Sequence, residues 1–236
     1  MSNPFKLEIL QAINDWQRGT TTARGKKLEE LCVNLPEKYT KVDFPCYRKM
    51  NLKKDGVFSI FAHLCLPERI SSWSSSVDVV KSFKHGVSLK IGEQSFIYKT
   101  IPSQNEVIIN LIAVYESYDF HSAVNLFRDD IKDIKLGIDR YHNSQLEVIL
   151  KKKVVTHKDI YILGGRSSDF CVSHSSNGKN LSLSALAYDI TTNKVIFFKW
   201  LTPEKTSKVI ETVLRKSPQP FNVYSMNYGY VPSKTK

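Results

Sequence analysis

Apolar residues recur every three to four positions in two stretches near the N-terminus, as they do along one face of a helix. The first stretch follows Asn3-Pro4, a typical helix start, and should end near Gly19. Its apolar residues are Leu7, Leu10, Ile13 and Trp16. The second stretch ends at Pro36, and its apolar residues are Leu28, Leu31, Cys32 and Leu35. The pattern predicts two N-terminal helices that pack on the body of the fold.

Beyond the second helix, short apolar runs are separated by turn residues, which is typical of antiparallel strands. The expected strands are residues 44–48, 69–75, 86–91, 107–113, 147–150 and 160–163. A short helix is expected over 76–83. Near the C-terminus the pattern predicts a hairpin over 181–201, with its turn at Thr191-Thr192-Asn193, and then a helix over 203–216. This order of elements predicts an α+β fold.

The composition is that of an ordinary globular protein. Of the 236 residues, 42% are hydrophobic and 11% aromatic, which excludes a fully disordered or collagen-like chain. The four cysteines stand far apart without a CxxC pair, so a zinc ribbon and a disulfide scaffold are both disfavoured and reduced thiols are expected. No apolar run approaches the roughly 18 to 20 residues that span a bilayer. The N-terminus lacks the pattern of a secretory signal, so a cytoplasmic protein without a membrane partner is expected.

Positive charge is concentrated in the last third of the chain. The whole sequence has a formal net charge of +11. Residues 151–236 contain 14 Lys and Arg against 5 Asp and Glu, whereas residues 1–150 contain 20 against 18. A segment of net charge +9 attracts a polyanion such as RNA, DNA or an acidic protein surface, although lysines also serve simply to keep a surface soluble.

Most familiar catalytic templates are absent from the sequence. There is no GxxxxGK[ST] loop, no GxGxxG after a strand, no HExxH and no GxSxG. None of the six histidines stands at metal-ligand spacing from a second ligand, so no metal is expected. Nucleoside triphosphatase, zinc hydrolase and serine hydrolase functions are therefore disfavoured.

Three short features remain, each on or directly next to an expected strand. They are Tyr47-Arg48, Ser72-Trp73-Ser74 and Gln145-Leu146-Glu147. Strand alternation should place the two serines on one face with the indole on the other, and should place Gln145 beside Glu147. Taken singly, each has an ordinary explanation: a surface salt bridge, a polar edge strand and a solvated strand face.

In this order and spacing, the features resemble the NAD-dependent mono-ADP-ribosyltransferases of the arginine–serine–glutamate type, which include clostridial and pierisin-like toxins and several phage enzymes. That family carries an aromatic-arginine pair, then Ser-x-Ser, then Gln- or Glu-x-Glu before an aliphatic run, on successive strands. Tyr47-Arg48, Ser72-Trp73-Ser74 and Gln145-Leu146-Glu147 match these motifs, with Trp73 where threonine is commonest. The resemblance covers about residues 40 to 165.

The resemblance implies an ADP-ribosyltransferase-like fold, with two packed antiparallel sheets around an NAD cleft and the N-terminal helices on one side. Residues 1–165 would form the catalytic domain. Residues 166–236 would form a basic hairpin-and-helix extension packed on the same domain.

The resemblance also implies roles in binding and cleaving NAD, the substrate. Arg48 beside Tyr47 would hold the NAD phosphates, and Ser72 would steady the nicotinamide ribose. Ser74 would support Glu147. The Glu147 carboxylate would bind the ribose 2′-hydroxyl and stabilise positive charge as the nicotinamide–ribose bond breaks.

Other residues would meet the acceptor of ADP-ribose. In the family, glutamine at the position of Gln145 goes with amide, hydroxyl or nucleobase acceptors, so an arginine acceptor is disfavoured. Tyr141 lies in a loop similar to the family's target-recognition turn. Lys151, Lys152 and Lys153 directly follow the Glu147 strand, where they would either meet a phosphate backbone or form a solvated strand end.

The charge favours RNA or DNA as acceptor, with a host protein as the alternative. An intracellular enzyme of this kind implies a toxin held in check by an antitoxin or immunity protein, or a phage-encoded or antiviral defence factor. A non-catalytic basic nucleic-acid-binding module stays open as a different class of function. Convergence of Arg48, Ser72 and Glu147 on one site would favour the enzyme.

Overall fold

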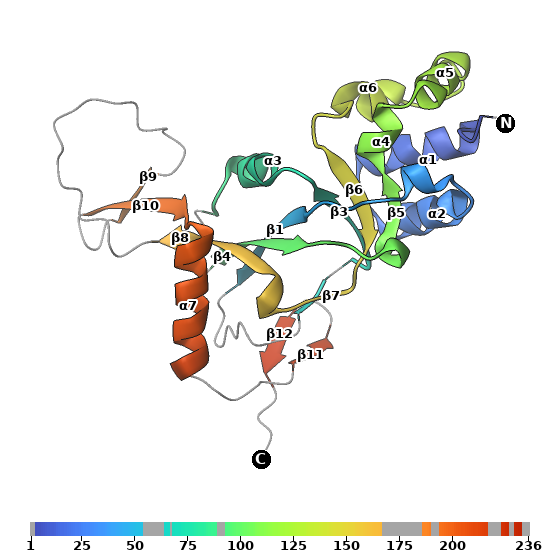
Figure 1. Cartoon of the computed structure of the whole chain (residues 1–236). Coiled ribbons are helices and arrows are strands. Elements are labelled where there is room, and N and C mark those ends of the chain that lie inside the picture. The colour runs from blue at the N-terminus through green and yellow to red at the C-terminus, as the bar shows by residue number, and fades with distance from the viewer. Residues whose placement is uncertain are drawn as a thin grey trace. The chain divides into compact units, whose positions relative to one another are not determined.

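The computed structural model describes residues 3–53, 64–66, 68–88, 93–166, 186–189, 194–216, 223–226 and 229–232. These residues form helices and antiparallel strands, so the mixed α+β class expected from the sequence is confirmed (Figure 1). Within these ranges no helix is long and apolar enough to cross a membrane.

The chain divides into two compact units that alternate along the sequence. The first unit comprises Met1–Tyr47, Cys65–Val79 and Thr100–Val154, and the second comprises Arg48–Leu64, Val80–Lys99 and Val155–Lys236. The elements at the borders are β1 (Cys46–Lys53), β2 (Leu64–Cys65), α3 (Val77–Ser82), β4 (Glu93–Thr100) and β7 (Val154–Val155).

In the first unit, antiparallel strands are covered by helices. Its strands run in the order β5-β6-β3 and then the start of β1. Its inner strands are β3 (Ile70–Ser74), β5 (Val107–Asn110) and β6 (Glu147–Lys151). Its helices are α1 (Leu7–Arg18), α2 (Thr22–Cys32), α4 (Leu111–Tyr115), α5 (Tyr118–Leu126) and α6 (Ile138–Tyr141), with 3-10 turns at Glu37–Tyr39, Gln104–Glu106 and Ile134–Leu136. Figure 1 shows α1 and α2 side by side next to β5.

The core of the first unit explains why both N-terminal helices pack where they do. One apolar stripe of α1 is buried, and it includes Trp16, which is 1% exposed. Gly25 of α2 permits a close approach, because a Cβ there would lie 3.1 Å from both Ile70 of β3 and the Trp16 ring. Ile70 and Ile149 belong to the same hydrophobic cluster as α1 and α2. The two helices therefore cover the face of β3 and β6 that carries these isoleucines.

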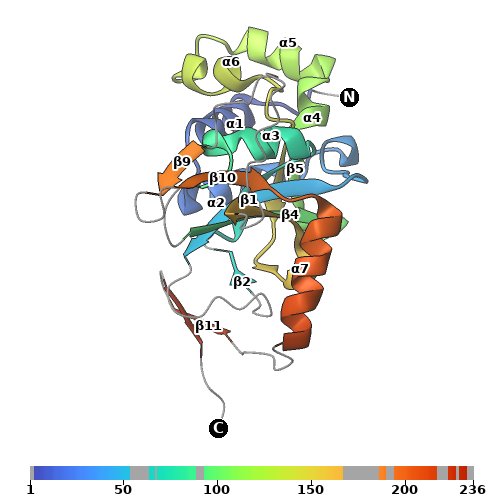
Figure 2. The same ribbon diagram turned by 90° about the vertical axis from the view of Figure 1, so that its left-hand side faces the viewer.

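The second unit is also built on antiparallel strands, in the order β1-β4-β8-β10-β9. Its remaining elements are β8 (Ile160–Arg166), β9 (Leu186–Asp189), β10 (Lys194–Trp200), α7 (Pro203–Lys216), β11 (Val223–Met226) and β12 (Gly229–Pro232), with 3-10 turns at Phe83–His85 and His157–Asp159. Helix α7 packs on β8, and Figures 1 and 2 show it as the long orange-red helix that follows β10.

Several expected elements are confirmed. The C-terminal hairpin is present as β9 paired with β10, and α7 has the expected bounds. Residues 181–185 and the expected turn at 191–193 lie outside the described residues. Helix α3 lies within the expected 76–83.

Other boundaries differ from the expectation. Helix α1 begins at Leu7 rather than at Pro4, because the Asn3 carboxamide oxygen accepts the N–H of Phe5 and holds the preceding chain in a turn. The expected strand over 107–113 stops at Asn110, whose side chain caps α4 by accepting the N–H groups of Ile112 and Ala113. Residues 86–88 are not in a strand, and 89–91 lie outside the described residues.

Candidate active site

The strands that carry the three sequence motifs are neighbours in the sheet. Strand β3 lies between β6 and β1. Ser74 of β3 is opposite Glu147 of β6 on one side and opposite Tyr47 of β1 on the other. Directly opposed residues project from the same face, and Ser72 shares that face because it is two residues from Ser74. Tyr47, Ser72, Ser74 and Glu147 therefore form one polar row.

Glu147 is almost completely buried, at 5% exposed. Its Oε1 accepts a hydrogen bond from the Trp16 indole Nε1–H at 3.1 Å, and the same N–H reaches Ser72 Oγ at 3.1 Å. The side chain of Gln17, the next residue of α1, also acts on the carboxylate and lowers its pKa. The α1 helix and β3 thus supply the polar partners of this acid.

Burial raises the pKa of Glu147, while hydrogen bonds from Ser72, Trp16 and Gln17 act in the opposite direction. Burial disfavours the charged carboxylate, and each donor aimed at the anion restores part of the loss. An acid with a raised pKa, on the same strand face as other polar groups, is typical of a functional site. The arrangement holds one carboxylate in a fixed place and a dry environment.

Ser74 supports Glu147 through the backbone rather than through the carboxylate. Its hydroxyl donates to the Gln145 carbonyl oxygen at 2.7 Å, and the N–H of Ser75 donates to the Leu146 carbonyl oxygen at 2.9 Å. Leu146 adopts a positive φ of 47°. Strand alternation therefore begins at Glu147 and does not extend back to Gln145, contrary to the expectation that the two side chains lie side by side on one strand.

The aromatic-arginine pair spans the border between the two units. Tyr47 is half-buried and is the residue in register with Ser74. Arg48 follows it in β1 and is the first residue of the second unit. Of the two, Tyr47 lies in the polar row with Ser74 and Glu147, whereas strand alternation places Arg48 on the opposite face of β1, so Arg48 does not join the row.

Tyr141 ends α6, four residues before Gln145. The Arg140 guanidinium carbon lies 5.2 Å from the centre of its ring. Ser144 closes a turn with Tyr141: its N–H (2.9 Å) and its hydroxyl (2.6 Å) both donate to the Tyr141 carbonyl oxygen. His142 between them has a positive φ of 44°. The segment from Tyr141 to Leu146 is thus a tight loop with two strained non-glycine residues.

The three lysines after Glu147 have different surroundings. Lys151 forms an ion pair with Glu29 of α2 at 2.8 Å, and Lys152 forms one with Glu106 at 3.5 Å. Lys153 is exposed. Two of the three positive charges are therefore compensated by acids of the first unit.

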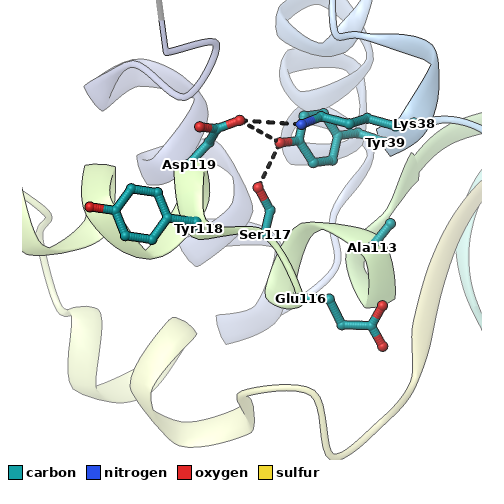
Figure 3. Close-up of a pocket in the computed structure, with 7 residues that line it drawn as sticks. All are labelled: Lys38, Tyr39, Ala113, Glu116, Ser117, Tyr118 and Asp119. Carbon is teal, nitrogen blue, oxygen red and sulfur yellow. Dashed lines mark hydrogen bonds and ion pairs between the residues drawn. The ribbon is translucent and has the colours of Figure 1, made fainter.

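A pocket of about 460 Å³ lies elsewhere in the first unit, and none of the predicted site residues lines it (Figure 3). Its lining residues are Lys38, Tyr39, Ala113, Glu116, Ser117, Tyr118 and Asp119. Asp119 accepts from Lys38 Nζ at 3.2 Å and from the Tyr39 hydroxyl at 3.1 Å. Because these polar groups satisfy one another, they tie the 37–39 turn to the start of α5.

The described residues contain no group of His, Cys, Asp or Glu arranged to hold a metal ion. Cys32 and Cys46 are free, buried thiols, and burial raises the pKa of each to about 12. Thiols held in the protonated form are poor nucleophiles.

Sequence reasoning missed Trp16 and Gln17 as members of the site. Trp16 was identified only as the last residue of the apolar stripe of α1, which was expected to pack on the body of the fold. The available signal was the indole N–H, because a buried tryptophan needs an acceptor for it. In the structure that acceptor is the predicted site itself.

Comparisons with protein-family models, with curated proteins and with solved structures found no match to this chain.

Proposed function

We propose that the protein is a mono-ADP-ribosyltransferase that cleaves NAD and transfers ADP-ribose to a macromolecule. The observation that carries the proposal is the polar row of Tyr47, Ser74 and Glu147 on three neighbouring strands, with Ser72 at the buried carboxylate. The first and second motifs are about 25 residues apart in the chain, and the second and third about 70. Only some of the possible strand orders would bring all three onto neighbouring strands. Their adjacency supports a common site.

In the proposed reaction, the bond between C1 of the ribose and the nicotinamide nitrogen breaks. Nicotinamide leaves as a neutral molecule with the bonding electron pair, and positive charge develops on the ribose. Glu147 stabilises this charge as a fixed anion, because an oxocarbenium-like centre needs a nearby carboxylate more than a strong base. An acceptor nucleophile then attacks C1 and releases its proton to solvent.

Access to Glu147 is expected from the side away from α1. Trp16 and Gln17 cover one side of the carboxylate, whereas Tyr47, Ser72 and Gln145 are all half-buried and so partly open to solvent. In this proposal Ser72 and Tyr47 contact the nicotinamide ribose, whereas a role of Arg48 in binding the NAD phosphates stays a prediction from the resemblance alone.

The acceptor in this proposal is RNA or DNA, with a protein side chain other than arginine as the alternative. The net charge of +9 in residues 151–236 supports a nucleic acid. The ion pairs of Lys151 and Lys152 leave Lys153 as the best candidate of the three for a phosphate. A toxin paired with an antitoxin, or a phage or defence factor, is the corresponding biological proposal.

Labelled NAD tests the proposal. The wild-type protein and the Glu147→Gln variant are incubated separately with RNA, single-stranded DNA and a cell protein extract, and both label transfer and nicotinamide release are followed. Glu30→Gln, at an exposed position of α2, is the matched control. We expect transfer and release by the wild type and Glu30→Gln, and a loss of at least about a hundredfold in Glu147→Gln.

The acceptor that receives label names the target class. Folded wild-type protein that releases no nicotinamide and labels none of the three acceptors, while binding RNA, would instead indicate a basic binding module.

A further inference from the structure

The last turn of α1 lies against Glu147 and offers it two consecutive donor side chains. Trp16 Nε1–H is shared between Glu147 Oε1 and Ser72 Oγ, each at 3.1 Å. The side chain of Gln17, next in the same turn, acts on the carboxylate as well and lowers its pKa. A tryptophan that served only the core would be equally satisfied by any nearby acceptor, yet this one joins the two side chains of the proposed site.

The amide of Gln17 has a defined orientation. The Tyr115 hydroxyl of α4 donates to Gln17 Oε1 at 2.8 Å, which leaves the amide NH2 group as the donor for Glu147. Tyr115 is buried and is the titratable group that faces Glu147 from α4; Asp139 of α6 acts on Tyr115 in turn. Burial raises the Tyr115 pKa, the hydrogen bond to Gln17 lowers it, and the charges of Glu147 and Asp139 raise it further. This phenol is therefore a neutral donor.

The end of α1 is itself held in place. Asn14 is fully buried, and it donates to the Lys132 carbonyl oxygen at 2.8 Å and accepts from the Ile138 N–H at 3.0 Å. Arg18 forms ion pairs with Asp15 at 3.2 Å and with Asp133 at 2.7 Å. These contacts fix the helical turn from which Trp16 and Gln17 project.

We propose that Trp16 and Gln17 are positioning residues for Glu147: Trp16 holds its carboxylate in one rotamer through a hydrogen bond, and the donor groups of both side chains keep it ionised. The inference rests on the proposed function for its catalytic consequence. A carboxylate that must stabilise a developing cation has to be charged and fixed before the bond breaks. The helix that covers the site thus becomes part of its chemistry.

Trp16→Phe and Gln17→Met each delete the donor that acts on Glu147 while keeping most of the side-chain volume; Gln17→Met also removes the acceptor of the Tyr115 hydroxyl. Trp73→Phe is the matched control, because Trp73 is equally buried, lies on the opposite face of β3, and donates its Nε1–H to Ser71 at 3.0 Å. The full-length proteins are compared in nicotinamide release from NAD across pH.

For Trp16→Phe and Gln17→Met we expect kcat to fall about tenfold or more, with KM for NAD changed less than about threefold. The acidic limb of the pH profile should move to higher pH, because losing a donor to the anion raises the pKa of Glu147. Trp73→Phe should leave both kcat and the pH profile unchanged. Equal losses in Trp73→Phe would overturn the inference.

A second measurement separates this inference from the proposed function. The titration of Glu147 is followed by NMR of carboxyl-labelled glutamate, with Glu147→Gln identifying its signal. A higher pKa in Trp16→Phe and Gln17→Met supports the positioning role even if the wild type releases no nicotinamide, an outcome that would remove the proposed function alone. A Glu147 titration unchanged in both variants overturns the inference whatever the activity.

Discussion

Glu147 combines near-complete burial with hydrogen bonds that favour its charge. Burial prevails and its pKa is raised, so the folded state binds a proton more readily than the unfolded state does. The free energy of unfolding should therefore fall as pH rises from the ordinary value near 4.5 through the raised folded value, and should stay lower above it. The buried acid therefore lowers the stability of the fold at the pH where it would act.

Glu147→Gln should accordingly stabilise the protein at neutral pH. The amide oxygen can still accept from Trp16, while the buried charge is gone. We expect its free energy of unfolding to exceed that of the wild type by an amount that grows as the pH rises through the raised pKa of Glu147. Thermal unfolding between pH 4 and 8 checks this, with Glu30→Gln as control. Parallel curves for Glu147→Gln and the wild type would contradict it.

Leu146 stores backbone strain directly before Glu147, with a φ of 47°. A side chain branched at Cβ, such as valine, clashes with its own backbone at this φ, whereas glycine adopts it freely. Leu146→Val should therefore lower the free energy of unfolding by about 1–2 kcal/mol. Leu146→Gly should cost less than this, because relief of strain offsets the greater entropy of the unfolded chain. Urea unfolding of both variants tests the order, and a more stable Leu146→Val would refute it.

At the scale of elements, the loop before α6 packs tightly against α1. A Cβ on Gly137 would lie 2.4 Å from Asn14 Oδ1 and 2.5 Å from the Asn14 carbonyl oxygen. Because backbone is one of the two obstacles, a rotamer change cannot relieve the clash.

Gly137→Ala should thus destabilise the protein by about 1–3 kcal/mol and shift α6 away from α1. The same exchange at Gly86, whose Cβ would meet nothing closer than 3.6 Å but whose φ is +83°, separates backbone strain from packing. Equilibrium unfolding measures both. A Gly137→Ala protein as stable as the wild type would mean that α1 and the 131–138 segment are not in close contact.

Sequence patterns predicted the long elements better than the short ones. Helices α1 and α7 carry clear apolar periodicity, and both were expected. Helices α4, α5 and α6 have five, nine and four residues, too short to be stable by propensity alone. They depend on tertiary contacts such as those of Asn14, which no local pattern reveals. The apolar run 107–113 was expected to be one strand because the capping role of Asn110 is not visible in periodicity.

The candidate site shows the same division between local and non-local information. Ser72, Ser74 and Glu147 could be chosen from the sequence because each stands in a short motif on a strand. Their cross-strand register, and the contacts of Trp16 and Gln17, depend on which strands pair and which helix covers them. The positive φ of Leu146 likewise could not be read from an extended pattern.

At the scale of the whole molecule, the proposed NAD chemistry lies on strands of the first unit. Positive charge is concentrated in residues 151–236, most of which belong to the second unit. The proposed NAD cleavage therefore belongs to the first unit, and the proposed attraction of a nucleic-acid acceptor belongs mainly to the charge of the second.

A crystal structure of the Glu147→Gln variant with NAD bound is the most direct test. We predict the ribose 2′-hydroxyl within hydrogen-bonding distance of residue 147, and Ser72 at the same ribose. NAD bound away from Ser72 and residue 147 would contradict the proposal.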